Sequence, residues 1–419
     1  MEHFDHHSTE FAENWRDQYA QLRAKCPVAH TDSHGGYYVA TSYDAIQQIL
    51  HDPQRFVCGR DLDLGTGQTV PGGVTVPTNA VRMGMMEMDP PRSQELRRIV
   101  SSRFTAKAVK AYEPRLEQLV SWCLDRVIEK GSMDFVDDIA NPLPALVTLD
   151  YLGLPLEKWE MYATTLHKAA YREKGSGRAV AAMLDDLHSI VRDRRENPRS
   201  NGDIVELVVE GEVDGKPLSE DLVVELLFML LNGGIDTTTA LIANTFLFLD
   251  DHHDERAWLS EDSSRIPGAV DEFIRYTSPS TGVARTVKEP VTVGGTELQA
   301  GDRILLALGS ANADDNHFDD ADQIHLDRQR NRHLSFGSGM HRCLGSFIAP
   351  AEMSVLIREV LRRMPDYQID RSKVVAYPTI PLVNGHIAMP ATFTPGQRIM
   401  QDILRTELPF AREEAEAKG

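Results

Sequence analysis

Cysteine and positive charge are scarce in this chain. Its 419 residues include only four cysteines (Cys26, Cys58, Cys123 and Cys343), and no two of them are close in the sequence. Without a CxxC pair, they predict neither a disulfide framework nor a structural zinc site. The 44 Lys and Arg residues are outnumbered by 63 Asp and Glu residues, which gives a net charge of −19. So acidic a chain is not expected to bind nucleic acid or an anionic membrane.

Long hydrophobic runs are also missing. The N-terminus is polar and lacks the apolar segment of a signal peptide. The longest candidate, LVVELLFMLLNGG, is interrupted by Glu225 and Asn232, so we expect no membrane anchor and a cytoplasmic protein. The histidines at the start, His3, His6 and His7, are expected to belong to a solvated, mobile segment.

Helical spacing of apolar residues dominates the rest of the chain. It predicts helices in four regions: 92–130, 155–197, 219–250 and 344–364. Strand signals are short and lie at 35–41, 291–298 and 303–309, a hairpin is expected within 374–395, and the glycines and prolines of 64–78 predict a long loop. The sequence therefore predicts a mainly α protein with small β-sheets. We expect a single domain over 1–419, with a peripheral polar tail at 400–419.

One predicted helix is unusually long. Ser219 can cap its start, and the helix then runs for about 32 residues, or roughly 48 Å. Its centre reads NGGIDTTT (232–239), which is a poor helix-forming sequence. One explanation is a kink or a close helix crossing. The other is a helix that is opened so that a ligand can approach its backbone and polar groups.

The segment HLSFGSGMHRCLG (333–345) concentrates glycine around one cysteine. Its fixed positions spell F-G-x-G-x-H-x-C-x-G and are Phe336, Gly337, Gly339, His341, Cys343 and Gly345. An apolar helix is predicted directly after it. A cysteine at a helix N-terminus meets unpaired N–H groups and the positive end of the dipole, which lower its pKa. Cys343 is therefore expected to be a protected thiolate ligand.

This segment resembles the haem-binding loop of the cytochrome P450 family, and the chain as a whole resembles the soluble bacterial class. The resemblance implies a P450-like fold with the long central helix over the haem. It implies that Cys343 ligates the iron of haem b and that Phe336 and Gly337 lie beside the cofactor. Contacts with the haem propionates are implied for His341, Arg97 and Arg285.

Two further motifs resemble the family. GGIDTT (233–238) resembles the oxygen-activation motif, which implies that Gly233 leaves space for O₂ while Asp236 and Thr237 deliver protons as catalytic residues. A second role stays open for Thr237, a hydrogen bond back to the carbonyl four residues earlier. The residues that resemble the family's structural Glu-Arg-Arg network are Glu272, Arg275 and Arg328.

Two positions depart from the family pattern. Ser93 stands where members often carry His, so one propionate contact is expected to be missing or mediated by water. Pro350 replaces an arginine after the cysteine and is expected to bend the following helix about two turns in. The loss of this positive charge also puts in doubt any partner-docking arrangement taken from relatives.

The resemblance implies a monooxygenase that inserts one oxygen atom of O₂ into a hydrophobic small molecule by hydroxylation. Electrons would come from a separate ferredoxin or flavodoxin with its reductase. Phe228, Met229 and Asn232 are expected to bind substrate, together with the segments 64–86, 163–178, 280–284 and 380–386. The alternatives are a peroxide-driven peroxygenase, a non-catalytic haem-binding protein and a non-haem helical protein.

A local basic face could receive the redox partner in this acidic chain. Its candidate residues are Arg98, Arg103, Lys107, Lys110, Arg330 and Arg342. Scattered, solvated charges are an equally good explanation of these residues.

Overall fold

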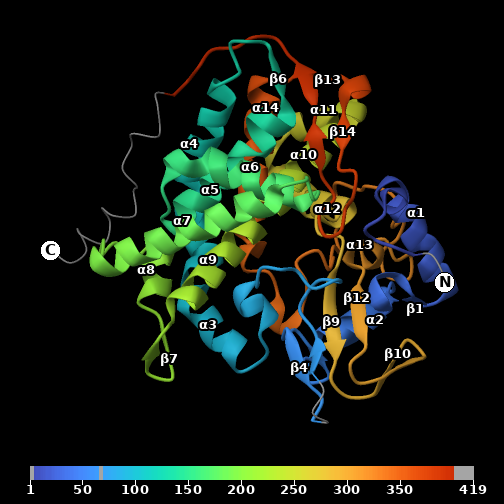
Figure 1. Ribbon diagram of the computed structural model, residues 1–419. Coiled ribbons are helices and arrows are strands. Elements are labelled where there is room, and N and C mark those ends of the chain that lie inside the picture. The colour runs from blue at the N-terminus through green and yellow to red at the C-terminus, as the bar shows by residue number, and fades with distance from the viewer. Residues whose placement is uncertain (1–3, 66–68, 401–419) are drawn as a thin grey trace.

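The computed structural model describes residues 4–65 and 69–400. Helices make up most of it (Figure 1). The α-helices are α1 (Thr9–Lys25), α2 (Tyr43–Leu50), α3 (Arg92–Ser101), α4 (Ala106–Asp125), α5 (Pro142–Leu152), α6 (Trp159–Ala170), α7 (Ser176–Glu196), α8 (Ile204–Val209), α9 (Glu220–Gly234), α10 (Asp236–Asp251), α11 (His253–Glu261), α12 (Ile266–Thr277), α13 (Leu308–Ala311) and α14 (Ile348–Arg363). The predicted mainly α class is confirmed.

The strands are short, as predicted. They are β1 (Val28–Thr31), β2 (Tyr37–Ala40), β3 (Phe56–Val57), β4 (Asp61–Asp63), β5 (Thr69–Pro71), β6 (Ser132–Asp134), β7 (Glu212–Val213), β8 (Lys216–Pro217), β9 (Val283–Val287), β10 (Val291–Val293), β11 (Thr296–Leu298), β12 (Arg303–Leu306), β13 (Gln368–Ile369), β14 (Val375–Ala376), β15 (His386–Ala388) and β16 (Pro390–Thr392). The largest sheet has the order β1-β2-β12-β9-β3, in which only β12 and β2 are parallel. It lies beside α1 and α2, apart from the main group of helices (Figure 1).

The C-terminal region contains the predicted hairpin only in part. Strands β14 and β15 pair with each other, but β16 leaves them and lies between β13 and β6. The predicted loop at 64–78 also contains structure, because β4 and β5 pair across its first part. Both differences arise from pairings between short strands, which leave little signal in the sequence.

Three of the predicted helical regions are interrupted. The first is divided between α3 and α4 by a 3₁₀ turn at Ser102–Phe104. The second is divided between α6 and α7, where Arg172 and Gly175 adopt positive φ angles that no helix tolerates. The sequence did not reveal these breaks, because apolar residues recur at helical spacing on both sides of each one.

The central helix is divided as well. Ser219 caps α9 by accepting a hydrogen bond from the Leu222 N–H, as predicted. The helix breaks at Ile235, and α10 begins at Asp236. An 18-residue window of this 32-residue region is apolar enough for a membrane span, but 72% of the window is buried inside the protein. The region therefore packs as a core helix.

The proximal helix corrects the expectation for Pro350. A 3₁₀ turn, Leu344–Ser346, follows Cys343, and α14 begins only at Ile348. Pro350 thus lies in the first turn of α14, where no backbone N–H has a helical partner. The proline removes no helical hydrogen bond there, so the expected bend two turns into the helix is wrong.

His6 and His7 do not lie in a solvated segment, contrary to the expectation. His6 is buried, with its Nδ1 atom 2.7 Å from the hydroxyl oxygen of Tyr37. His7 is half-buried, and its Nε2 atom bonds the carbonyl oxygen of Val76 at 2.8 Å. His3 and the tail at 401–419 lie outside the described residues.

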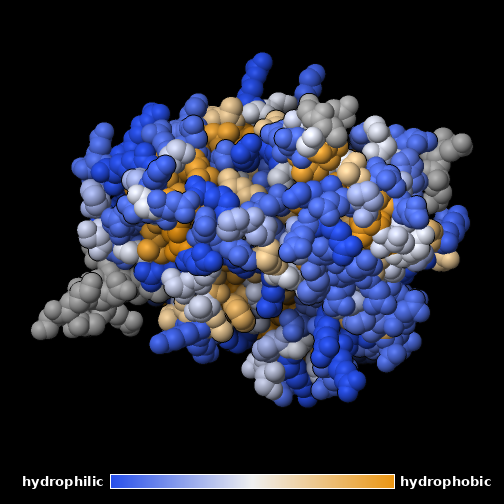
Figure 2. Space-filling model, turned by 90° about the horizontal axis from the view of Figure 1, so that it is seen from below, coloured by the Kyte–Doolittle hydropathy of each residue, from blue (hydrophilic) through white to orange (hydrophobic). Residues whose placement is uncertain are grey.

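The surface reflects the acidic composition. Figure 2 shows a mostly hydrophilic face on which hydrophobic side chains form separate patches. Large apolar side chains are instead concentrated in interior clusters, the largest of which joins α4, α10, α12 and α14. This core holds α10 and the segment before α14 in fixed positions on two sides of a cavity.

Candidate active site

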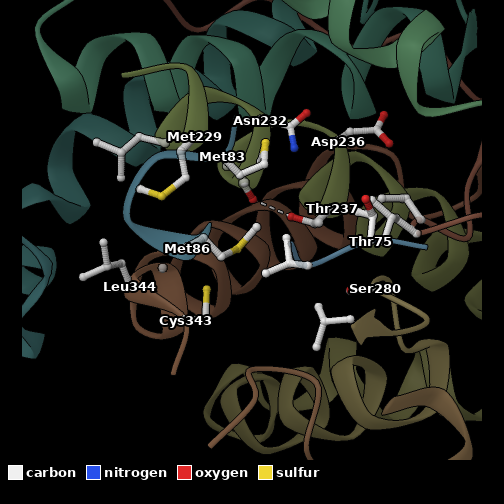
Figure 3. A pocket seen from close by; sticks show the side chains of 18 of the residues that line it. Thr75, Met83, Met86, Met229, Asn232, Asp236, Thr237, Ser280, Cys343 and Leu344 are labelled. Carbon is white, nitrogen blue, oxygen red and sulfur yellow. Dashed lines mark hydrogen bonds between the residues drawn. The ribbon is translucent and has the colours of Figure 1, made fainter. Parts of the chain in front are cut away.

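A cavity of about 860 Å³ lies between the break of the central helix and the Cys343 loop. Its wall includes the region before α3, the loop before β9 and the turn between β14 and β15. In Figure 3 the sulfur of Cys343 points into the space on whose other sides Met86 and Thr237 lie. The cavity thus brings together the two motifs that the sequence places more than a hundred positions apart.

The loop before Cys343 depends on two glycines. Gly337 and Gly339 have φ angles of +63° and +68°, which favour glycine. A Cβ atom at Gly339 would also lie 2.6 Å from the carbonyl oxygen of Leu50. The loop closes through a 2.9 Å hydrogen bond from the Cys343 N–H to the Phe336 carbonyl oxygen. This closure fixes the direction of the cysteine side chain.

The electrostatics of Cys343 differ from the prediction. Burial raises the pKa of the Cys343 thiol, while the Gly345 N–H and the guanidinium groups of Arg97 and Arg342 act in the opposite direction. The sequence argument counted only the lowering influences and missed the cost of desolvation. Binding to a metal ion deprotonates a thiol outright, so these lowering groups fit a ligand thiolate.

One rim of the cavity fits the acidic edge of a haem. Arg97, Arg285 and His341 all line the cavity. The Nε2 atom of His341 is buried without a partner among the described residues. Burial, with the charges of Arg285 and Arg97, lowers the pKa of His341 to about 4. Two carboxylates there would supply acceptors for these donors.

Ser93, which stands where family members often carry His, is buried and also lines the cavity. Its hydroxyl has no hydrogen-bond partner in the described part of the chain. A buried hydroxyl without a partner is unusual in folded proteins. A haem propionate or a water molecule would supply the missing hydrogen-bond partner of the Ser93 hydroxyl.

The distal motif lies at the helix break. A Cβ atom added to Gly233 would meet no heavy atom within 4 Å, whereas one added to Gly234 would lie 2.6 Å from Thr148 Oγ1. Gly233 thus borders open cavity, and Gly234 allows close packing against α5. The Thr237 hydroxyl donates a 2.7 Å hydrogen bond to the Gly233 carbonyl oxygen (Figure 3), which is the alternative contact considered for it.

Asp236 has two partners that the sequence did not reveal. Its Oδ1 atom accepts a 2.9 Å hydrogen bond from the Tyr377 hydroxyl and lies 3.2 Å from His167 Nδ1. All three side chains are buried. Asp236 also borders the cavity. His167 and Tyr377 fall within no motif, and only the fold brings them to Asp236.

The Glu-Arg-Arg residues form a buried network behind the Cys343 loop. The carboxylate of Glu272 accepts two hydrogen bonds from Arg275, at 2.7 and 2.8 Å, and one from Arg328 at 3.0 Å. Arg275 also donates to the carbonyl oxygen of Asn312. Asn312 in turn accepts from the Leu334 N–H at 2.6 Å. The network thus reaches the first residues of the cysteine loop.

Comparison with known proteins decides the family. A family model described as Cytochrome P450 matches residues 266–365. The steroid C26-monooxygenase of Mycolicibacterium smegmatis is 32% identical over 396 residues, which cover 92% of this chain and 94% of that enzyme. The chain belongs to the cytochrome P450 family. This membership makes it an oxidoreductase and implies a haem cofactor.

Other similar proteins agree. The cyclomarin C epoxidase CymV of Salinispora arenicola is 35% identical over 302 residues, covering 70% of this chain and 76% of that one. The structure of cytochrome P450 CYP268A2 of Mycobacterium marinum, solved with pseudoionone, has a TM-score of 0.83 at 26% identity and covers 93% of this chain and 98% of its own. The likeness extends through nearly the whole P450, including both sides of the cavity.

The substrate side of this P450 is mostly apolar. The predicted residues Phe228, Met229 and Asn232 all line the cavity. Met83 and Met86 add flexible, polarizable side chains from the predicted loop region 64–86 (Figure 3). Asn232 and Asp236 are the polar side chains labelled at the top of the same view.

The predicted basic face is only partly available. Lys110 pairs with Glu113 at 2.6 Å, and Arg103 donates a 2.5 Å hydrogen bond to the Gly202 carbonyl oxygen. The exposed cations that remain are Arg98, Lys107, Arg330 and Arg342. Phe347, four residues after Cys343, is 44% exposed. Four of the six predicted cations are therefore exposed without an ion pair among the described residues, and one of them, Arg342, lines the cavity.

Proposed function

We propose that this P450 inserts one oxygen atom of O₂ into a C–H bond of a hydrophobic small molecule. Haem b, held by Cys343, supplies the iron chemistry when bound. The observation that carries the proposal is the acid–alcohol pair Asp236 and Thr237, which lines the same cavity as the cysteine. O₂ activation consumes protons that such a pair can deliver, whereas a carrier protein has no need of it.

The chain's own residues have distinct parts. Arg97, Arg285 and His341 orient the acidic edge of the cofactor. Gly233 leaves room for the small ligand O₂, and the Thr237 hydroxyl holds a proton beside it. Asp236 passes protons from the protein side to Thr237 and to ordered water. Phe228 and Met229 exclude bulk water from the reacting carbon.

The substrate is a hydrophobic molecule, and an acidic end group is favoured. The exposed side chain of Arg172 lines the cavity and makes no ion pair among the described residues. Its nearest negative charge, Asp5, already pairs with His34 at 2.7 Å. A carboxylate on the outer end of the substrate would complement Arg172, while the apolar part fills the space above Cys343.

The electrons come from a separate ferredoxin or flavodoxin with its reductase in this proposal, and the enzyme acts in the cytoplasm. The exposed cations Arg98, Lys107, Arg330 and Arg342 and the exposed Phe347 would suit a small acidic partner. Such docking weakens with ionic strength, so KM for the partner should rise with salt while substrate affinity changes little.

Two measurements test the proposal. The reduced, carbon monoxide-bound protein should show the red-shifted absorption band of a thiolate ligand. Turnover should then require a ferredoxin and reductase. Product formation with hydrogen peroxide alone, at rates that a redox partner does not exceed, would instead identify a peroxygenase. A thiolate band without substrate-dependent electron consumption from any donor would identify a non-catalytic haem protein.

A further inference from the structure

The cluster around Asp236 is a closed triangle of polar atoms. Tyr377 Oη lies 2.9 Å from Asp236 Oδ1 and 2.8 Å from His167 Nδ1, and that nitrogen lies 3.2 Å from the same carboxylate oxygen. The three side chains come from the start of α10, from α6 and from the segment after β14. Each is buried, so water does not replace any of these contacts.

Counting protons restricts the states of this triangle. Tyr377 has one hydroxyl proton. If it donates to an ionised Asp236, the 3.2 Å contact with His167 is attractive only when Nδ1 carries a proton. If Asp236 is protonated, it donates to Tyr377 Oη, and the tyrosine hydroxyl then donates to a bare Nδ1. The same three atoms are therefore satisfied before and after one proton moves from histidine to aspartate.

Both ends of the cluster carry an unused polar atom. Among the described residues, neither His167 Nε2 nor Asp236 Oδ2 has a hydrogen-bond partner, although both atoms are buried. Buried atoms of this kind normally have a partner, and exceptions call for an explanation. One end belongs to the histidine and the other to the residue that borders the cavity. Protons can thus enter at one atom and leave from the other.

The outer end lies near the surface. Asp137 is exposed on the π-helical turn Val136–Ala140, which packs against α10. Burial and the charge of Asp134 raise the pKa of Asp137, and the charge of His167 acts on it in the opposite direction. Tyr171, a further titratable neighbour, meets the His167 ring edge to face, with 5.6 Å between the ring centroids. His167 therefore interacts electrostatically with an acid at the surface as well as with the buried Asp236.

We propose that His167 is a proton shuttle that reloads Asp236 from the Asp137 side, and that Tyr377 is a positioning residue for this transfer. His167 Nε2 accepts a proton from water or from Asp137, and Nδ1 releases its proton to Asp236 Oδ1. One proton moves inward and no electron moves. A flip of the ring about its Cβ–Cγ bond then brings the newly protonated nitrogen to face Asp236, so that a second proton can follow. This inference rests on the role proposed for Asp236.

A first experiment reads the tautomer directly. In ¹⁵N-histidine-labelled, ferrous carbon monoxide-bound enzyme, the neutral ring of His167 should be protonated at Nδ1. The Nδ1 signal should shift in Tyr377→Phe, and the tautomer preference should be lost in Asp236→Asn. A neutral ring protonated only at Nε2 in the wild type would overturn the proposal, whatever the activity.

A second experiment separates shuttling from positioning. His167→Asn places an amide N–H where Nδ1 donates, but it cannot relay a proton. A shuttle predicts that His167→Asn and His167→Ala both lower kcat about tenfold and enlarge the solvent isotope effect, with unchanged substrate affinity measured spectroscopically. Near wild-type kcat in His167→Asn would overturn the proposal and leave His167 a structural role. The matched control is His188→Asn. His188 lies on α7 and is paired with Glu220.

The Asp236→Asn variant separates this inference from the proposed function. If Asp236→Asn slows turnover and His167→Asn does not, only the shuttle fails. If neither variant slows turnover, the shuttle and the proposed role of Asp236 fail together. The expected result is that both are slow and that the double variant is no slower than Asp236→Asn, because the two residues act in one path.

Discussion

The hydroxyl of Thr237 donates its proton to the carbonyl oxygen of Gly233, one turn earlier, at 2.7 Å. This bond holds the side chain at the helix break while its oxygen lone pairs remain free to accept. The contact and the proton-delivery role are therefore compatible. Because its one proton is used in this bond, Thr237 faces the cavity as an acceptor, and it can hold a proton that water or the ligand donates.

Thr237→Val is expected to retain haem and substrate binding but to divert reducing equivalents to peroxide. The reason is that the Thr237 hydroxyl is lost from the cavity wall. We expect the peroxide-to-product ratio to rise about tenfold. Stoichiometry of NAD(P)H, O₂ and peroxide measures it. Thr239→Val removes a similar back-bond, 3.1 Å to the Ile235 carbonyl, from a buried residue and should stay coupled. If NAD(P)H consumption in Thr237→Val stayed fully coupled to product formation, protons would be delivered by other residues.

Cys343→Ala is expected to abolish both catalysis and the thiolate band in the carbon monoxide spectrum, because the proposed thiolate ligand of the haem iron is lost. Cys26→Ser provides the control, since the hydroxyl can replace the thiol as donor to the Val28 carbonyl oxygen. An active Cys343→Ala enzyme with an unchanged spectrum would contradict the ligand assignment.

Glu272→Gln is expected to destabilise the protein by about 3–5 kcal/mol, because two arginines would then share a buried site without their counter-charge. Urea unfolding of the haem-loaded enzyme measures the change. Glu261→Gln breaks an exposed pair with Arg265 and should cost about 0–1 kcal/mol. Equal effects of the two substitutions would show that the buried network contributes little to stability.

Acid should loosen the start of the chain. Burial, with the charges of His7, His34 and Arg172, lowers the pKa of His6 from 6.5 to about 3, and only Asp5 opposes this. The unfolded chain therefore takes up the proton first as the pH falls below 6.5. The contribution of this group to stability is constant above that pH and falls by about 2 kcal/mol by pH 5.

The slope of unfolding free energy between pH 6.5 and 5 measures this effect. His6→Gln should flatten the slope, while substitution of the exposed His253 by Gln should not. A slope that is the same in both variants would mean that His6 is not protonated on unfolding in this range.

The sequence allowed residues within a motif to be predicted as site residues. It did not reveal residues that are far apart in the chain and come together only in the fold. Cys343, His341 and Arg97 could be predicted to meet because they resemble positions in family motifs, and all three line one cavity. His167 and Tyr377 could not, because 210 positions separate them and no periodicity links them. The pKa direction of Cys343 was also missed, since desolvation depends on packing that the sequence does not display.

For the fold, too, local patterns could be predicted and features that depend on contacts between distant elements could not. Apolar spacing located the helices but not their interruptions at Ile235 and Ser102–Phe104, because apolar residues recur at helical spacing on both sides of each break. Pro350 was misjudged by one turn, since the start of α14 depends on the 3₁₀ turn after Cys343. His6 was misjudged because its burial depends on Tyr37, a residue in another element.

The bond from His7 to the Val76 carbonyl oxygen makes the beginning of the polypeptide part of the cavity wall. His7 thus shapes the space for ligands although no motif lies there. A substitution at His7 should change which ligands the enzyme accepts, as a substitution in the loop that carries Val76 should.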